Sequence, residues 1–208
     1  THCISSAASD VYKRQDLYDN YSQYNENEAV ISKLKTLKAK YGKIAIWGNR
    51  DYGGGAVREY ENIMIESGFS LLRNENQVFT LANERKILFT GLDDALLGNP
   101  QFASSSQMLE TSYDILLTHE PDEVRHYRNK GYELILSGHS HGGQINIPFI
   151  PQVQKKATSL MSHSDNYTGG LYNLGGNEKL YVNTGVGTTH VSARFGVAPE
   201  IAVFNIGI

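Results

Sequence analysis

The sequence contains one cysteine, Cys3, among its 208 residues. A single thiol excludes an intramolecular disulfide and a metal site built from several thiolates. Long apolar runs are also missing. Short runs such as residues 115–117 and 134–136 fall far short of the roughly 20 residues that a membrane-spanning helix needs. No transmembrane segment is therefore predicted within this chain.

An excess of basic residues is equally absent. The formal net charge is −3 and the sequence pI is about 6.1, so no nucleic-acid partner is expected. The acidic excess is too small to identify another partner. With 40% hydrophobic and 20% charged residues, and no internal repeat, the composition indicates one globular domain.

An initiator methionine is lacking too, since the chain begins at Thr1. The stretch SDVYKRQ, residues 9–15, resembles the read-through translation of a sequencing adapter. This interpretation makes residues 1–15 a non-native leader and residues 16–208 the natural domain. The alternative is a native N-terminal arm. The cellular location is left open by either interpretation.

Helical and strand patterns alternate along the centre of the chain. Residues 25–43 and 56–68 predict amphipathic helices that end at Gly42 and Gly68, with a short strand, KIAIW, between them. Three short β-rich runs follow in residues 69–94, and a polar helical stretch is expected near residues 101–111.

Two further strands, in YDILLTH and YELILSGHSH, flank a helix that begins near Pro121. This alternation predicts parallel strands with crossover helices in an α/β fold. The last third offers strands in KLYVNTGVG and PEIAVFNI. Residues 148–179 are rich in Pro, Gly, Ser and Asn and predict a long irregular loop.

Polar side chains follow three of these strands directly. Asn49, Arg50 and Asp51 follow the first, His119 follows the second, and His139 and His141 follow the third. The carboxyl ends of parallel strands share one edge of a sheet, where ligands bind, so these loops are expected to face one another.

Imidazole nitrogens and an amide oxygen suit divalent Zn, Mn or Fe. A lone histidine is more often a packed or hydrogen-bonded residue than a ligand. Taken together with Asn49, however, the histidines predict a metal centre. The His-x-His pattern by itself fits several unrelated metal-binding folds.

In this order, GNRD, LLTHEPD and SGHSHGGQI resemble the motifs of the calcineurin-like metallophosphoesterase superfamily, in particular its bacterial phosphodiesterase branch. The resemblance covers nearly all of residues 16–208. It implies a four-layer αββα sandwich of two mixed β-sheets. The family's first motif, D-x-H, has no counterpart here, which implies that the first strand is missing.

The resemblance also implies a set of metal ligands. Asn49, His119 and His139 would hold one divalent ion, His141 the other, and Asp16, in DLYDN, would bridge two ions of Mn, Fe or Zn. Because D-x-H supplies two ligands of the second ion, this chain is expected to bind closer to one equivalent of metal than two.

Arg50 occupies the family's histidine position in the GNRD motif. An arginine stabilises negative charge on a leaving oxygen but cannot act as a general acid near neutral pH, because its pKa lies above about 12. Asp51 is expected to orient Arg50 by a paired hydrogen bond. A surface ion pair is the alternative role for Arg50. Asp93 and Asp94 are expected to form a turn, and the alternative is that they accept hydrogen bonds from residues of the site.

The resemblance implies a phosphoester hydrolase that uses a metal-activated hydroxide for in-line attack on phosphorus. The substrate is expected to be a phosphodiester or a phosphomonoester. The resemblance favours the diester, with a lipid- or envelope-linked compound as one class. A degenerate module that binds metal and phosphate without turnover is the alternative, supported by Arg50. A third interpretation is an inactive fragment of an active parent enzyme.

Overall fold

The computed structural model describes residues 2–5, 27–55, 57–102, 110–159, 162–188 and 193–207. Asp16 lies outside these residues, and so does most of the helical stretch expected near residues 101–111. Residues 2–5, within the predicted leader, form the short strand β1 (His2–Ser5). The division of the chain at residue 15 stays a prediction.

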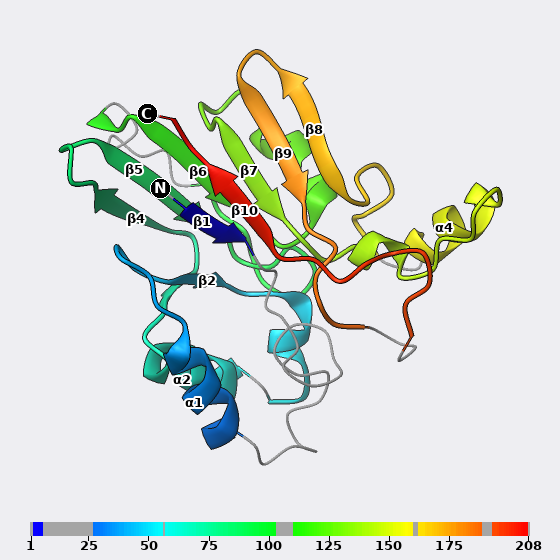
Figure 1. The fold of residues 1–208 in the computed structure, drawn as a ribbon, viewed down its shortest axis with the longest axis horizontal. Coiled ribbons are helices and arrows are strands. Elements are labelled where there is room, and N and C mark those ends of the chain that lie inside the picture. Colours follow the sequence, from blue (N-terminus) through cyan, green and yellow to red (C-terminus); the bar gives the residue numbers. More distant parts are fainter. Residues whose placement is uncertain are drawn as a thin grey trace.

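A six-stranded sheet forms the centre of the molecule (Figure 1). Its spatial order is β4 (Glu75–Thr80), β5 (Lys86–Gly91), β6 (Tyr113–Leu117), β7 (Leu134–Ser137), β9 (Glu178–Val182) and β8 (Gly170–Gly175). The four central strands run parallel, whereas β4 and β8 run antiparallel to their neighbours at the two edges. The sheet is therefore mixed, as predicted.

Two small sheets lie over one face of this large sheet. In one, β2 (Ile44–Ile46) pairs in parallel with β3 (Ser70–Leu72). In the other, β1 pairs antiparallel with β10 (Ala202–Asn205). Phe204 of β10 packs against Tyr181 of β9, with ring centroids 4.9 Å apart. Among the described residues, the second layer of strands thus consists of two separate ladders.

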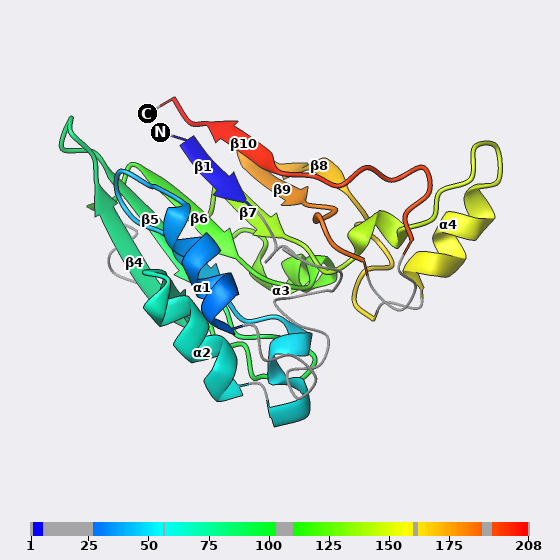
Figure 2. The same cartoon turned by 60° about the horizontal axis from the view of Figure 1, so that its bottom comes forward.

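Helices complete the outer layers. The two longest, α1 (Asn27–Thr36) and α2 (Val57–Glu66), lie side by side (Figure 2). The turn η4 (Pro121–Glu123) leads into the short α3 (Val124–Tyr127). Near the other end of the molecule lies α4 (Pro151–Thr158). None of the helices in the described ranges is long and apolar enough to span a bilayer.

Three hydrophobic clusters separate four layers. Trp47, Tyr60 and Met64 fill the space between the two longest helices and the β2–β3 sheet. A second cluster, around Phe89 and Ile115, lies between the small sheets and the large sheet. The third lies between the large sheet and α3. The order helix, sheet, sheet, helix confirms the predicted αββα architecture.

Alternation along β2 shows how the sequence produces these layers. Ile44 and Ile46 pack toward the large sheet, whereas Ala45, between them, packs toward the helices. The period of two follows from the pleat of the strand. The two sheets approach closely at Gly91, where an added Cβ atom would lie 2.3 Å from the Cβ atom of Leu72. Only glycine fits this contact without a shift of the backbone.

The prediction of an irregular loop across residues 148–179 is wrong, because α4 and β8 lie within it. Strand β8 begins and ends with glycine and alternates poorly in hydrophobicity, so its pattern is weak. Its pairing with β9, for example Leu171 opposite Tyr181, is a tertiary contact that overrides local propensity. Helix α1 also ends well before the predicted stop at Gly42.

Candidate metal centre

The structure brings three of the predicted ligands to one edge of the sheets. Strands β6 and β7 are parallel neighbours, with Leu117 opposite Leu136. The loops that follow them, carrying His119 and His139, therefore leave the sheet side by side. Asn49 comes from the opposite sheet, where it begins the turn η2 (Asn49–Gly55) shortly after β2.

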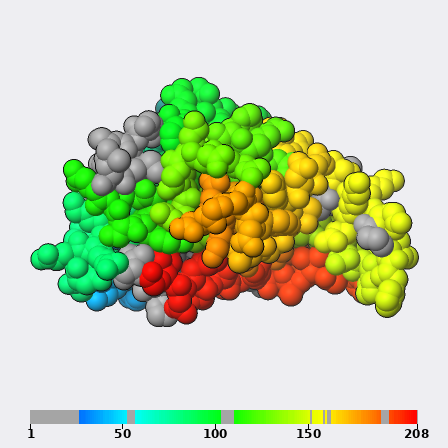
Figure 3. All heavy atoms as spheres, turned by 90° about the horizontal axis from the view of Figure 1, so that it is seen from above, coloured from blue at the N-terminus to red at the C-terminus, as the bar shows by residue number. Residues whose placement is uncertain are grey.

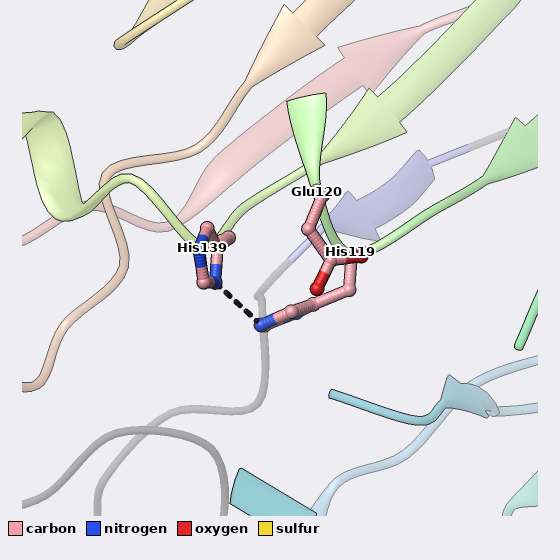
Figure 4. Close-up of side chains that lie close together, drawn as sticks. All are labelled: His119, Glu120 and His139. Atoms are coloured by element: carbon pink, nitrogen blue, oxygen red, sulfur yellow. Dashed lines mark hydrogen bonds between the residues drawn. The ribbon is translucent and has the colours of Figure 1, made fainter. Parts of the chain in front are cut away.

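Distances between the three side chains fit a shared cation. The Nε2 atom of His119 lies 3.2 Å from Oδ1 of Asn49. The same atom lies 3.2 Å from Nδ1 of His139 (Figure 4). Ligand atoms at about 2.0–2.2 Å from one metal ion lie roughly 3.0–3.5 Å from each other. The distance from His119 Nε2 to each of the other two donor atoms therefore matches that between neighbouring ligands on a single ion.

A hydrogen bond fixes which nitrogen of His139 faces this position. The Nε2 atom of His139 lies 2.9 Å from the carbonyl oxygen of Ser162. Since a carbonyl can only accept, Nε2 carries the proton in the neutral ring, and Nδ1 presents its lone pair to the site. Hydrogen bonds of this kind orient histidine ligands in metalloproteins and raise their basicity.

The segment that supplies this carbonyl is held by Asp122, in the loop after β6. The buried carboxylate of Asp122 accepts hydrogen bonds from the backbone N–H of Asp165 at 3.0 Å, and from the backbone and side chain of Asn166 at 3.1 and 2.9 Å. Glu123 in addition contacts His163 at 2.8 Å. The loop that carries His119 thus also positions His139, through the segment around Ser162.

Burial keeps both histidines neutral. His119 is 8% exposed and His139 is 6% exposed. Desolvation lowers the pKa of His119 to about 4 and that of His139 to about 3. Metal ions bind the neutral imidazole, so no proton has to be displaced from a charged ring near pH 7. His139 also has a left-handed backbone, with φ of 63°, a strained conformation that is typical of functional loops.

Glu120, which follows His119 directly, was not among the predicted ligands. One ligand atom from each of His119, Glu120 and His139 lies within 4.8 Å of the others. Glu120 is fully buried, and its Oε1 atom has no hydrogen-bond partner among the described residues. An unpaired buried carboxyl oxygen is costly unless a cation or proton satisfies it. Glu120 therefore adds an oxygen donor to the candidate site.

A second buried carboxyl, that of Asp94, lies beside Glu120. Burial, assisted by Asp94, raises the pKa of Glu120 to about 10. Asp94 also forms the predicted turn, because its Oδ2 atom accepts from the backbone N–H of Leu96 at 3.0 Å and of Leu97 at 2.6 Å. The turn is confirmed, but the sequence did not indicate that both carboxyls are fully buried next to the histidines.

His141 has a different partner, Arg194. The Nη2 atom of Arg194 lies 3.2 Å from Nδ1 of His141, and the same guanidinium donates to the carbonyl of Thr184 at 2.8 Å. Burial and then the charge of Arg194 lower the pKa of His141 to about 3. Because arginine only donates, the neutral ring of His141 carries its proton on Nε2. No sequence pattern indicated this contact, since 53 positions separate the two residues.

Asp51 closes the turn that carries Asn49. It is almost fully buried, and its Oδ2 atom accepts from the backbone N–H of Gly48 at 3.0 Å. Its own N–H donates to the carbonyl of Gly48 at 3.1 Å. Arg50 is half-buried within the same turn. The proposed pairing of Arg50 with Asp51 and the role of Asp16 stay predictions.

Comparison with known proteins identifies relatives along most of the chain. The chain is 38% identical over 192 residues to YkuE of Bacillus subtilis (strain 168), which is named as an uncharacterized metallophosphoesterase. The aligned region covers 92% of this chain and 65% of YkuE. YkoQ of the same organism, of the same description, is 29% identical over 194 residues, covering 92% and 70%. Phosphodiesterase YaeI of Escherichia coli (strain K12) is 26% identical over 200 residues, covering 92% and 66%.

The chain belongs to the calcineurin-like metallophosphoesterase superfamily. The chain spans only about two thirds of the length of these three relatives. No family model matches it, and no solved structure matches it significantly.

Proposed function

We propose that the protein is a metal-dependent phosphoester hydrolase of the phosphodiesterase type. The convergence of Asn49, His119 and His139 within 3.2 Å contacts carries this proposal, together with the relatives named metallophosphoesterase or phosphodiesterase. Asp16 and His141 complete the proposed ligand set for two ions of Mn, Fe or Zn. When bound, the ions supply hydroxide at neutral pH for in-line attack and neutralise charge on the phosphoryl oxygens.

Residues of the chain have separate roles in this proposal. The buried His119 and His139 and the half-buried Asn49 would position one ion. The protein around the two histidines excludes water, which strengthens electrostatic interactions with the phosphoryl group. Arg50 would stabilise negative charge on the leaving oxygen without transferring a proton. Asp51 holds the backbone of the turn that carries both Asn49 and Arg50. The proposed substrate is a phosphodiester, with a lipid- or envelope-linked compound as one class.

A non-catalytic module that binds metal and phosphate is the second candidate. The observation that favours it is Arg50, which cannot supply a proton where the family has a histidine. A leaving group with a low pKa does not need that proton, so an activated diester distinguishes the two candidates. Turnover of a nitrophenyl phosphodiester supports the enzyme, whereas metal binding without turnover supports the module.

The decisive experiment uses the full-length natural protein loaded with Mn²⁺. We expect it to hydrolyse the nitrophenyl diester, and we expect His139→Ala to abolish turnover and the binding of one equivalent of metal. His126→Ala is the matched control, because His126 lies on the exposed side of α3. If His139→Ala and His126→Ala have equal activity, the proposed site is wrong.

A further inference from the structure

A β-turn precedes α4 and contains an unusual residue. The N–H of Ile150 donates to the carbonyl of Ile147 at 3.1 Å, with Pro148 in the second position and Phe149 in the third. Phe149 has a left-handed backbone, with φ of 69°. Proline followed by a residue with positive φ is the pattern of a type II turn, in which glycine is strongly favoured at the third position.

The Phe149 side chain gains nothing from packing inside the protein. It is fully exposed, at 101%, and its neighbour Ile150 is 46% exposed. A glycine would relieve the backbone strain and remove an apolar ring from water. Strain that retains an exposed aromatic side chain indicates a role outside the fold of the chain itself. We call residues 147–150 the apolar tip.

Basic residues and an absence of acidic ones accompany the apolar tip. Lys155 and Lys156 are exposed in the last turn of α4. The sequence has no Asp or Glu between Glu133 and Asp165, although the whole chain carries a net charge of −3. This region, yellow in Figure 3, forms one end of the molecule. The two exposed apolar side chains of the tip, even together with the exposed Phe195 that is bridged to Ile145, are too few for a typical protein–protein interface, which buries about 800 Å² per partner.

The apolar tip is also connected to the candidate metal centre. The side-chain amide of Gln154, in α4, donates to the carbonyl of Gly142 at 3.2 Å. Gly142 follows His141 in the loop after β7. This hydrogen bond fixes the position of α4 relative to the loop. A surface that binds the apolar tip would therefore lie at a defined distance from the candidate metal centre.

We propose that the apolar tip and α4 dock onto an anionic lipid surface. Phe149 and Ile150 would insert at the boundary between headgroups and acyl chains, and Lys155 and Lys156 would face the lipid phosphates. Insertion of apolar side chains together with attraction of lysines to anionic lipids is the usual basis of reversible surface binding. Docking is a binding event, so it does not depend on the proposed hydrolase activity.

The test is co-sedimentation of the protein with two kinds of vesicle, one of phosphatidylcholine and one of phosphatidylcholine mixed with phosphatidylglycerol. We expect binding to the anionic vesicles that weakens with added salt. Phe149→Gly suits the backbone conformation of the turn, so the fold should be retained. We expect this variant to bind roughly tenfold more weakly, and Lys155→Glu and Lys156→Glu to weaken binding by roughly fivefold each.

Ile65→Ser is the matched control, because Ile65 is an exposed apolar residue, at 57%, on α2, away from α4 (Figure 1). It should leave vesicle binding unchanged. Absence of binding by the natural sequence, or equal binding by Phe149→Gly, overturns the proposal. Sedimentation without vesicles tests whether the apolar tip instead binds a second copy of the chain. If the natural sequence self-associates and Phe149→Gly abolishes this self-association, the lipid proposal is wrong.

Discussion

The two parts of the candidate metal centre are built differently. Asn49, His119 and His139 are drawn together from two sheets, and a carbonyl hydrogen bond sets the orientation of His139. His141, two positions after His139, instead contacts the guanidinium of Arg194. We call these the buried part and the arginine part of the centre.

The charges of the described side chains show which of the two parts favours a cation. In the buried part, neutral histidines and carboxyl oxygens face one another, an arrangement that favours added positive charge. In the arginine part, a fixed positive charge is already present. A protein can arrange its charge for a cation at one position and for an anion, such as a phosphoryl group, at the next.

Glu120→Gln tests the electrostatics of the buried part. The pKa of Glu120 is raised to about 10 in the folded protein, so the folded state holds a proton that the unfolded chain releases above about pH 4.5. Its contribution to stability is present below pH 4.5 and is lost as the pH rises toward 10. Glutamine stays neutral and avoids this loss.

Without metal, the free energy of unfolding of Glu120→Gln should therefore rise relative to the natural sequence by up to about 1.4 kcal/mol per pH unit between pH 5 and 8. Urea unfolding in the presence of a chelator measures this difference. A difference that does not change with pH would mean that Glu120 is ionised in the fold. The buried part would then carry a negative charge without metal, and its contrast with the arginine part would be larger than we infer.

Asp122→Ala tests whether the support of His139 matters to the buried part. Loss of the carboxylate releases the backbone of Asp165 and Asn166 and loosens the carbonyl that orients His139. Loss of such indirect support typically weakens metal binding roughly 10- to 100-fold. Calorimetric titration with Mn²⁺ measures the change.

A merely structural role for Asp122 is distinguished by two further measurements. Asp122→Asn keeps one acceptor oxygen and should restore part of the affinity. The ring-nitrogen chemical shifts of His139 should indicate mixed tautomers in Asp122→Ala alone. Asp165→Asn is the control, because the Asp165 side chain is exposed. Unchanged affinity in Asp122→Ala would show that the segment around Ser162 does not position the ligand.

Sequence patterns predicted the buried part better than the arginine part. Asn49, His119 and His139 each follow a strand, and strand ends can be located from hydrophobic runs alone. The parallel arrangement of β6 and β7 then brings His119 and His139 together, whereas the approach of Asn49 from the β2–β3 sheet depends on how the two sheets pack. Local periodicity also predicted most strands and the α/β class, whereas the four-layer αββα arrangement came from the resemblance to the superfamily.

Contacts between loops were not predictable in this way. Arg194 reaches His141 across 53 positions, and Asp122 reaches Asn166 across 44, without any periodic pattern. Strand β8 was missed for a related reason, since its glycine-rich sequence becomes a strand only by pairing with β9. Glu120 was available to sequence reasoning, because it stands beside His119, but the depth of its burial was not.

Arg194→Gln tests the arginine part and should have the smallest effect. The guanidinium at 3.2 Å from His141 opposes a cation there and, through its hydrogen bond to Nδ1, keeps the ring proton on Nε2. Its removal should strengthen binding of a second equivalent of Mn²⁺ by roughly fivefold in the full-length protein, the size expected for a partly screened charge. The first equivalent, in the buried part, should be unaffected.

Arg58→Gln, at an exposed position of α2, is the control for net charge. An equal gain for both equivalents, or the same gain in Arg58→Gln, would show that the charge of Arg194 acts on the whole protein and that the two parts are not electrostatically distinct.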